Sequence, residues 1–151
     1  ATTEIYTLSL HDALPILMLL LDAEALSALA HGPSSRRDKV RALIAHMRAK
    51  DLPVATIATV LSEVVRGRPA DAGVFSGLKR ERVLVHSVDT RVGVRAGHLL
   101  GAVRVGSEMA VDAFTVAVAD LAGGAMVATA DVGDLERLAA HARHVRIVDI
   151  T

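Results

Sequence analysis

Short apolar runs that alternate with helical patterns constrain the fold of this chain more than any other feature of its sequence. The first run, residues 17–21, has no polar interruption, which is typical of a parallel strand buried on both faces. Strands in alternation with helices predict an α/β fold with a mainly parallel sheet. The expected strands are residues 17–21, 53–56, 82–86, 126–129 and 145–150.

Length and composition predict one domain with an aliphatic core. The chain has 151 residues, of which 52% are hydrophobic and only 2% aromatic, and its formal net charge is zero. Cysteine is absent, which excludes disulfides and thiolate metal sites and fits a reducing compartment. The longest apolar run, residues 13–21, contains Pro15 and is too short to span a membrane. We therefore expect a cytoplasmic protein without a membrane segment.

Residues 1–16 need separate treatment, because their sequence resembles the translation of a common sequencing adapter. We interpret them as a non-native segment and exclude them from fold reasoning. A signal peptide is a weaker interpretation, since no Lys or Arg precedes Arg36. The single domain is then expected to span residues 17–151.

Four acidic residues stand where the expected elements begin or end. Asp22 and Asp131 follow apolar strands, Asp112 lies in the first turn of an otherwise apolar helix, and Glu63 adjoins the apolar face of another helix. In open α/β sheets, ligands bind at the carboxyl ends of the strands. Each acid alone could be a helix cap or a solvated residue. Together, they predict one divalent-metal site.

Oxygen-only ligands favour Mg²⁺, with Mn²⁺ as a substitute. A hard cation removes the repulsion between carboxylates that lie close together. Such a site can polarise a phosphoryl oxygen and lower the pKa of a bound water for in-line attack on a phosphodiester. The acids therefore favour a phosphodiester hydrolase.

Four short motifs carry a resemblance to a known family. They resemble, in order and spacing, the acidic motifs of the PIN domain in VapC-type toxins, and the resemblance covers residues 17–151. Its most specific part is the Val-Asp-Ala helix start followed by Thr-x-Asp-x-x-Asp-Leu. The motifs are Leu20-Leu21-Asp22-Ala23, Leu61-Ser62-Glu63-Val64, Val111-Asp112-Ala113 and Thr129-Ala130-Asp131-Val132-Gly133-Asp134-Leu135.

The resemblance implies a three-layer α/β/α sandwich around a mainly parallel sheet of four to five strands. It implies a Mg²⁺-dependent endoribonuclease, the toxin of a type II toxin–antitoxin system, that hydrolyses RNA phosphodiester bonds. The implied partners are RNA, a VapB-type antitoxin and a second copy of the chain in a homodimer. The implied metal-binding and catalytic residues are Asp22, Glu63, Asp112 and Asp131, and the accessory residues are Thr129, Asp134 and Glu108.

Basic residues after the Glu63 helix could flank the acidic site and contact RNA phosphates. Basic residues 36–50 fit an ordinary solvated helix face better. The scarcity of aromatic residues disfavours a base-stacking platform. The candidate phosphate contacts are Arg66, Arg68, Lys79, Arg80 and Arg82.

Other functions remain open. The main alternative is a non-catalytic PIN-like module that binds RNA or protein. A phosphoryl-transfer domain with Asp22 as nucleophile is disfavoured, because no Lys follows Lys79 and Glu24 stands where a phosphatase would have Asp. His141 and His144 could share a helix face, but a zinc site would need a third ligand.

Overall fold

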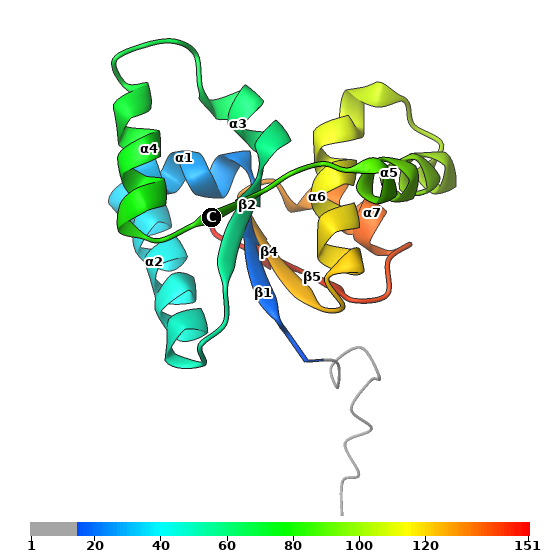
Figure 1. Ribbon diagram of the computed structural model, residues 1–151, viewed down its shortest axis with the longest axis horizontal. Helices are drawn as coiled ribbons and strands as arrows, with labels where there is room; N and C mark the ends of the chain where they lie inside the picture. The colour runs from blue at the N-terminus through cyan, green and yellow to red at the C-terminus, as the bar shows by residue number, and fades with distance from the viewer. Residues whose placement is uncertain (1–14) are drawn as a thin grey trace, which may run out of the picture.

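The computed structural model describes residues 15–151 and consists of a five-stranded sheet between two layers of helices (Figure 1). The strand order is β3-β2-β1-β4-β5, and every neighbouring pair is parallel. This confirms the predicted three-layer α/β/α sandwich. The strands are β1 (Met18–Leu21), β2 (Val54–Ile57), β3 (Leu84–His86), β4 (Ala125–Thr129) and β5 (Val145–Asp149).

Helices α1, α2 and α4 lie on one side of the sheet, and α5, α6 and α7 lie on the other (Figure 1). Helix α3 contacts both α1 and α6. No helix within residues 15–151 is long and apolar enough to cross a membrane. The helices are α1 (Ala23–His31), α2 (Ser34–Ala49), α3 (Ala58–Val64), α4 (Asp71–Arg80), α5 (Thr90–Val103), the 3-10 turn η1 (Ser107–Met109), α6 (Ala110–Leu121) and α7 (Val132–Ala139).

Strand β1 is the centre of the sheet, because it pairs with β2 on one side and with β4 on the other. All four of its residues are buried, as its unbroken apolar sequence predicts. Side chains alternate across a strand, so Leu20 packs in the core beneath α5, α6 and α7, whereas Leu19 and Leu21 pack against α1 and α2. One strand therefore contributes to both cores.

The carboxyl ends of β1, β2 and β4 lie side by side, because the three strands are neighbours and parallel. Leu21 is in register with Ala128 near the end of β4. The hydroxyl of Thr56 donates a hydrogen bond to the Leu21 carbonyl oxygen at 2.7 Å, which links β2 to β1 at the same edge. Each of the three strands leads directly into a helix. Residues at these three junctions therefore meet at one edge of the sheet.

Local turns shift several element ends from their predicted places. Strand β2 extends to Ile57, so Thr56 lies inside the strand and α3 begins at Ala58. Strand β3 begins at Leu84 instead of residue 82, because Arg82 adopts a left-handed turn with φ of 48°. The spacing of apolar residues in the sequence does not predict these shifts.

Helix α7 determines where the two histidines considered for zinc lie. It begins at Val132, directly after the last predicted acid, and ends at Ala139. His141 and His144 therefore lie beyond the helix and do not share a helix face. Within residues 15–151, no group of three His, Asp or Glu side chains is arranged to hold a metal ion, so the structure gives no support for zinc at these histidines.

The start of the described chain is fixed to the amino edge of the sheet. The expectation that residues 1–16 derive from an adapter falls mostly on residues 1–14, which lie outside the described residues. The Leu17 N–H donates to the Gly124 carbonyl oxygen at 2.8 Å. Gly124 has φ of +151°, and a Cβ there would overlap the carbonyl oxygen of Pro15. This close approach requires glycine.

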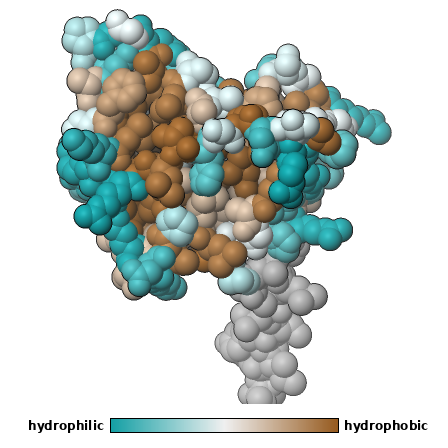
Figure 2. Space-filling view, in the orientation of Figure 1, coloured by the Kyte–Doolittle hydropathy of each residue, from teal (hydrophilic) through white to brown (hydrophobic). Residues whose placement is uncertain are grey.

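The space-filling view shows hydrophobic residues gathered on one face, over α4 and the edge of the sheet (Figure 2). Phe75 of α4 is 53% exposed, and Leu84 of β3 is 54% exposed. Val85 beside it is also exposed. Because β3 is an edge strand, this apolar surface adjoins backbone groups with no strand partner on one side.

We expect Leu20→Ala to lower the free energy of unfolding by about 2–5 kcal/mol, because Leu20 is fully buried and the cavity cannot close easily. Val94→Ala, at a side chain of α5 that is 54% exposed, is the control and should change the free energy of unfolding by less than about 0.5 kcal/mol. Urea unfolding measures both. Equal losses in the two variants would contradict the assignment of β1 as the shared centre of both cores.

Candidate metal centre

One pocket at the carboxyl edge of the sheet brings the four predicted acids together. Asp22 comes from the end of β1, Glu63 from α3, Asp112 from the first turn of α6, and Asp131 from the residue before α7. The pocket has a volume of about 180 Å³ and contains no basic residue in its lining. Its lining is completed by Ala23, Glu24, Val60, Val111 and Thr115.

Asp22 is the most buried of the four acids, with 7% of its surface exposed. It caps α1, and its Oδ1 accepts a hydrogen bond from the Ala25 N–H at 2.8 Å. Burial raises the pKa of Asp22 to about 6. Hydrogen bonds from Thr129 and Ala25 oppose this increase, and the charges of Asp112 and Glu24 add to it. The carboxylate is therefore held in place but costly to ionise.

Thr129 connects two of the acids. Its hydroxyl oxygen accepts a hydrogen bond from the Asp131 N–H at 2.9 Å and lies 3.1 Å from the Asp131 carbonyl oxygen. The same side chain hydrogen-bonds to the Asp22 carboxylate. Thr129 is fully buried at the end of β4. It therefore fixes the turn that carries Asp131 relative to the end of β1.

Asp112 is half-buried, and its environment is dominated by negative charge. Burial raises its pKa to about 6, and the charges of Glu63, Asp134 and Asp131 raise it further. Glu63 and Asp131 are themselves exposed at the rim of the pocket. The pocket thus combines two acids that resist ionisation, one buried and one half-buried, with two exposed acids at its mouth.

The donor set fits a hard divalent cation, because it consists of carboxylates with no sulfur or nitrogen ligand in the lining. The acids are close enough to raise one another's pKa. As they stand, however, no three of the acidic or histidine side chains in residues 15–151 are close enough to share an ion. Rotation of the exposed Glu63 and Asp131 side chains would be needed to close a coordination shell.

None of the three accessory residues lines the pocket, and Thr129 acts from beneath it. Asp134 lies 3.4 Å from Arg137 in an ion pair on α7 and acts on Asp112 through its charge. Glu108 accepts a hydrogen bond from the Gly106 N–H at 3.0 Å, and hydrogen bonds in this turn lower its pKa. Glu108 thus stabilises its own loop.

The five basic residues proposed for RNA contacts divide into two groups, and none lines the pocket. Arg66 and Arg68 lie in the loop between α3 and α4, where their N–H groups donate to Asp71. The remaining three, Lys79, Arg80 and Arg82, lie at the opposite end of α4. The loop pair is therefore nearer in sequence and structure to the Glu63 helix.

Sequence reasoning missed Glu24 as a pocket residue. It lies in the first turn of α1, two residues after Asp22, and is exposed at the rim. Its Oε2 is 3.9 Å from Nη1 of Arg36. The sequence contained a signal for Glu24, because a residue two positions after a helix cap lies in the same turn as the cap. Glu24 was instead considered only as a departure from a phosphatase motif.

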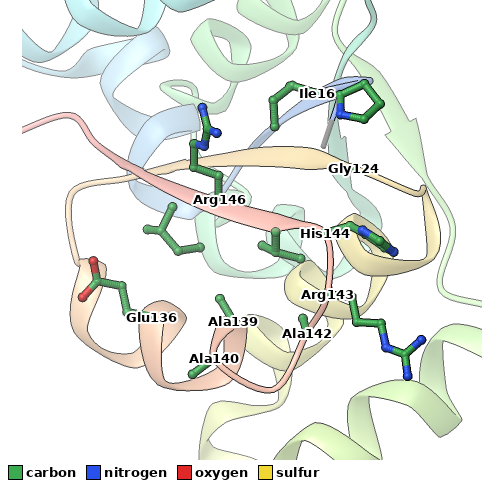
Figure 3. A pocket seen from close by; sticks show the side chains of 12 residues that line it. Ile16, Gly124, Glu136, Ala139, Ala140, Ala142, Arg143, His144 and Arg146 are labelled. Carbon is green, nitrogen blue, oxygen red and sulfur yellow. The ribbon is translucent and has the colours of Figure 1, made fainter. Parts of the chain in front are cut away.

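A second, wider cavity lies elsewhere in the described chain. It measures about 410 Å³ and is formed between α7, the start of β5 and the start of the described chain. Most of its labelled lining is small or apolar, and Glu136, Arg143 and Arg146 point in different directions (Figure 3). It adjoins the amino ends of the strands, away from the acids. Its size alone does not make it the chemical site.

Comparison with known proteins supports the fold. No family model matches the chain, and no curated protein matches it. Among solved structures, a chain of VapBC2 from Rickettsia felis, in a crystal structure with a DNA fragment from their promoter, matches with a TM-score of 0.58. The identity is 13%, and the match covers 87% of this chain and 98% of that chain. The two chains therefore share a PIN-like α/β/α fold.

We expect Asp112→Asn to stabilise the metal-free protein above about pH 6. The pKa of Asp112 is about 6 in the folded chain against 3.8 for the ordinary side chain, so the folded state binds more protons between these values. Its free energy of unfolding therefore falls as pH rises through this window. After a discount for partial exposure, the variant should gain about 1–2 kcal/mol at about pH 8.

Urea unfolding in EDTA measures this gain. The gain should disappear below about pH 4, where Asp112 is protonated in the folded state. Asp38→Asn, a change at an exposed acid of α2, is the control. A variant less stable than the parent at both pH values would show that favourable contacts hold Asp112, contrary to the crowding of like charges.

Proposed function

We propose that the chain is a Mg²⁺-dependent endoribonuclease, the toxin of a type II toxin–antitoxin system. The observation that carries this proposal is the convergence of four acids from four separate elements on one pocket at the carboxyl edge of the sheet. The shared fold with a chain of the VapBC2 complex supports it. In this proposal, Asp22, Glu63, Asp112 and Asp131 hold Mg²⁺, or Mn²⁺ in its place.

The four acids would have different tasks. Asp22 is fixed by the Ala25 N–H and by Thr129, so it would set the position of the site. Asp112 would supply a second inner carboxylate, and the exposed Glu63 and Asp131 would adjust to the ligand. When bound, the ion would polarise a phosphoryl oxygen and lower the pKa of an attacking water. Thr129 and Asp134 would act through Asp22 and Asp112, respectively.

The pocket volume limits how a substrate would approach. About 180 Å³ accommodates an ion with its waters or one phosphate group, but not a nucleotide. The scissile phosphodiester would therefore enter from the mouth while the neighbouring nucleotides lie across the surface. Arg66 and Arg68, in the loop after α3, are the better placed of the basic residues proposed from sequence.

The partners and the compartment belong to the same proposal. A VapB-type antitoxin would cover the acidic pocket, and the chain would act in the cytoplasm as a homodimer. The support for a homodimer is the apolar edge formed by Phe75, Leu84 and Val85, because exposed apolar patches of this kind mark interaction surfaces. An isologous dimer would bury the same patch on both copies.

One observation favours a second function, a PIN-like module that binds RNA or protein without cutting. Within residues 15–151, no three acidic side chains are already arranged around a common ion position. If Glu63 and Asp131 cannot rotate inward, the domain would lack a working metal site. Metal binding and cleavage therefore have to be measured separately.

Mg²⁺ should raise the stability of the parent chain and change that of Asp112→Asn much less. The reason is that the cation relieves the repulsion centred on Asp112, and binding to the folded state adds about 2.7 kcal/mol at a hundredfold excess over Kd. Thermal unfolding in Mg²⁺, with EDTA and Asp38→Asn as controls, measures this difference. An identical response in all three chains would place Mg²⁺ outside the acidic pocket.

Cleavage should depend on both the metal and the inner acids. Asp112→Asn should reduce the cleavage of a mixed pool of structured RNAs by at least about a hundredfold, because one inner carboxylate is lost. The measurement is gel analysis of the products in Mg²⁺ and in EDTA, with Asp38→Asn as the matched control. Stabilisation by Mg²⁺ without any cleavage would favour the binding module.

A further inference from the structure

The rim of the acidic pocket carries a cation that the sequence assigned to a solvated helix face. Glu24 lines the pocket, and its Oε2 lies 3.9 Å from Nη1 of Arg36. Arg36 belongs to the first turn of α2, which packs against α1. The guanidinium of Arg36 therefore lies at the pocket mouth, near the carboxylate of Glu24.

The charge of Lys39 acts at the same edge of the sheet. Asp149, at the end of β5, is in register with Thr129, at the end of β4 beside the pocket. Hydrogen bonds with Thr151 lower the pKa of Asp149, and the charges of Lys39 and Arg36 lower it further, so both cations lie near it. Lys39 follows Arg36 by three residues, which puts them on one face of α2.

Arg36 and Lys39 contribute little to the stability of α2 itself. The first turn of α2 contains no acidic residue, and cations near the start of a helix are disfavoured by its dipole. The pair between Arg36 and Glu24 is exposed and long, so it contributes less than about 1 kcal/mol. The guanidinium can therefore exchange Glu24 for another anion. By contrast, Arg37 donates to the Gly32 carbonyl oxygen at 2.6 Å and ties the α1–α2 turn.

We propose that Arg36 and Lys39 bind the RNA phosphates next to the scissile phosphodiester. This inference rests on the proposed ribonuclease function. The strand order puts β2, and the loop with Arg66 and Arg68, on one side of β1, and puts β5 with Asp149 on the other. RNA that crosses the pocket mouth along the carboxyl edge would thus leave the pocket on the side of α2. Arg36 and Lys39 are positioning residues for the strand on that side.

The test uses RNA binding, so it does not depend on turnover. The Asp112→Asn chain, which should not cut, is titrated against a short fluorescein-labelled single-stranded RNA of mixed sequence in Mg²⁺, and anisotropy gives Kd. In this background, Arg36→Gln with Lys39→Gln should raise Kd by about tenfold or more and reduce the salt slope by about 1.4, the value for two phosphate contacts.

Two further variants control for charge and for folding. Arg41→Gln removes a cation from the same helix, but this residue lies 4.0 Å from Glu81, so Kd should change by less than about twofold. Arg36→Lys preserves the charge and should restore much of the binding. Equal urea midpoints for all chains would exclude unfolding as the cause.

The outcomes separate this inference from the proposed function. Weaker RNA binding by the Arg36 and Lys39 variants supports the inference even if the parent does not cleave RNA. Cleavage by the parent, with the double variant binding RNA as tightly as Arg41→Gln, overturns the inference and leaves the nuclease intact. If the parent cleaves, the double variant should raise KM with little change in kcat. No RNA binding by any chain overturns both.

Discussion

The structure depends on the parallel pairing of β1 with β2 and β4 at once. This arrangement buries β1 on both faces, so its side chains belong to both helical layers. It also sets the direction of the chain: three strands end at one edge, and each must turn there into a helix. Two of these turns carry an acid: Asp22 caps α1 through its side chain, and Asp131 precedes α7 without a side-chain cap bond. The same pairing that builds the core therefore gathers carboxylates at one edge.

The carboxylates at this edge destabilise the fold that brings them together. Asp22 caps α1 but is buried, and Asp112 is surrounded by like charge, so both resist ionisation. Repulsion of this kind is relieved by protons, by cations or by movement of the exposed acids. Thr129 limits that movement at one point, because it joins the turn of Asp131 to Asp22. The pocket therefore has acids that resist ionisation at its base and exposed acids at its mouth.

The fold could be predicted because it follows from patterns along the chain. Uninterrupted apolar runs define β1 and β4, and the alternation with helices defines the parallel sheet. Asp22 and Asp131 were predictable site residues, since they follow those strands directly. The hydrogen bond of Thr56 to the Leu21 carbonyl oxygen could not be predicted, because it joins strands that are distant in sequence. The same holds for Arg36 and Lys39, whose position depends on how α2 packs on α1.

The accessory residues also show that residue order alone does not predict which side chains enter the site. Glu108 was proposed from the family resemblance, yet its carboxylate accepts a hydrogen bond from the N–H of Gly106 within its own turn. Glu24 was considered only as a departure from a motif, yet it lines the pocket. A motif records residue order, whereas the direction of a side chain depends on the hydrogen bonds available in the folded turn.

The start and the end of the described residues lie at opposite edges of the sheet, which has a practical consequence for protein engineering. Leu17 and Gly124 join at the amino edge of the sheet, so a tag placed before β1 would emerge far from the acids. Asp149 stands level with Thr129, so a fusion after Thr151 would emerge beside the pocket mouth. A peptide attached there by a short linker would have a high local concentration at the site. The C-terminus is therefore the natural point from which to tether a probe or an inhibitor to this domain.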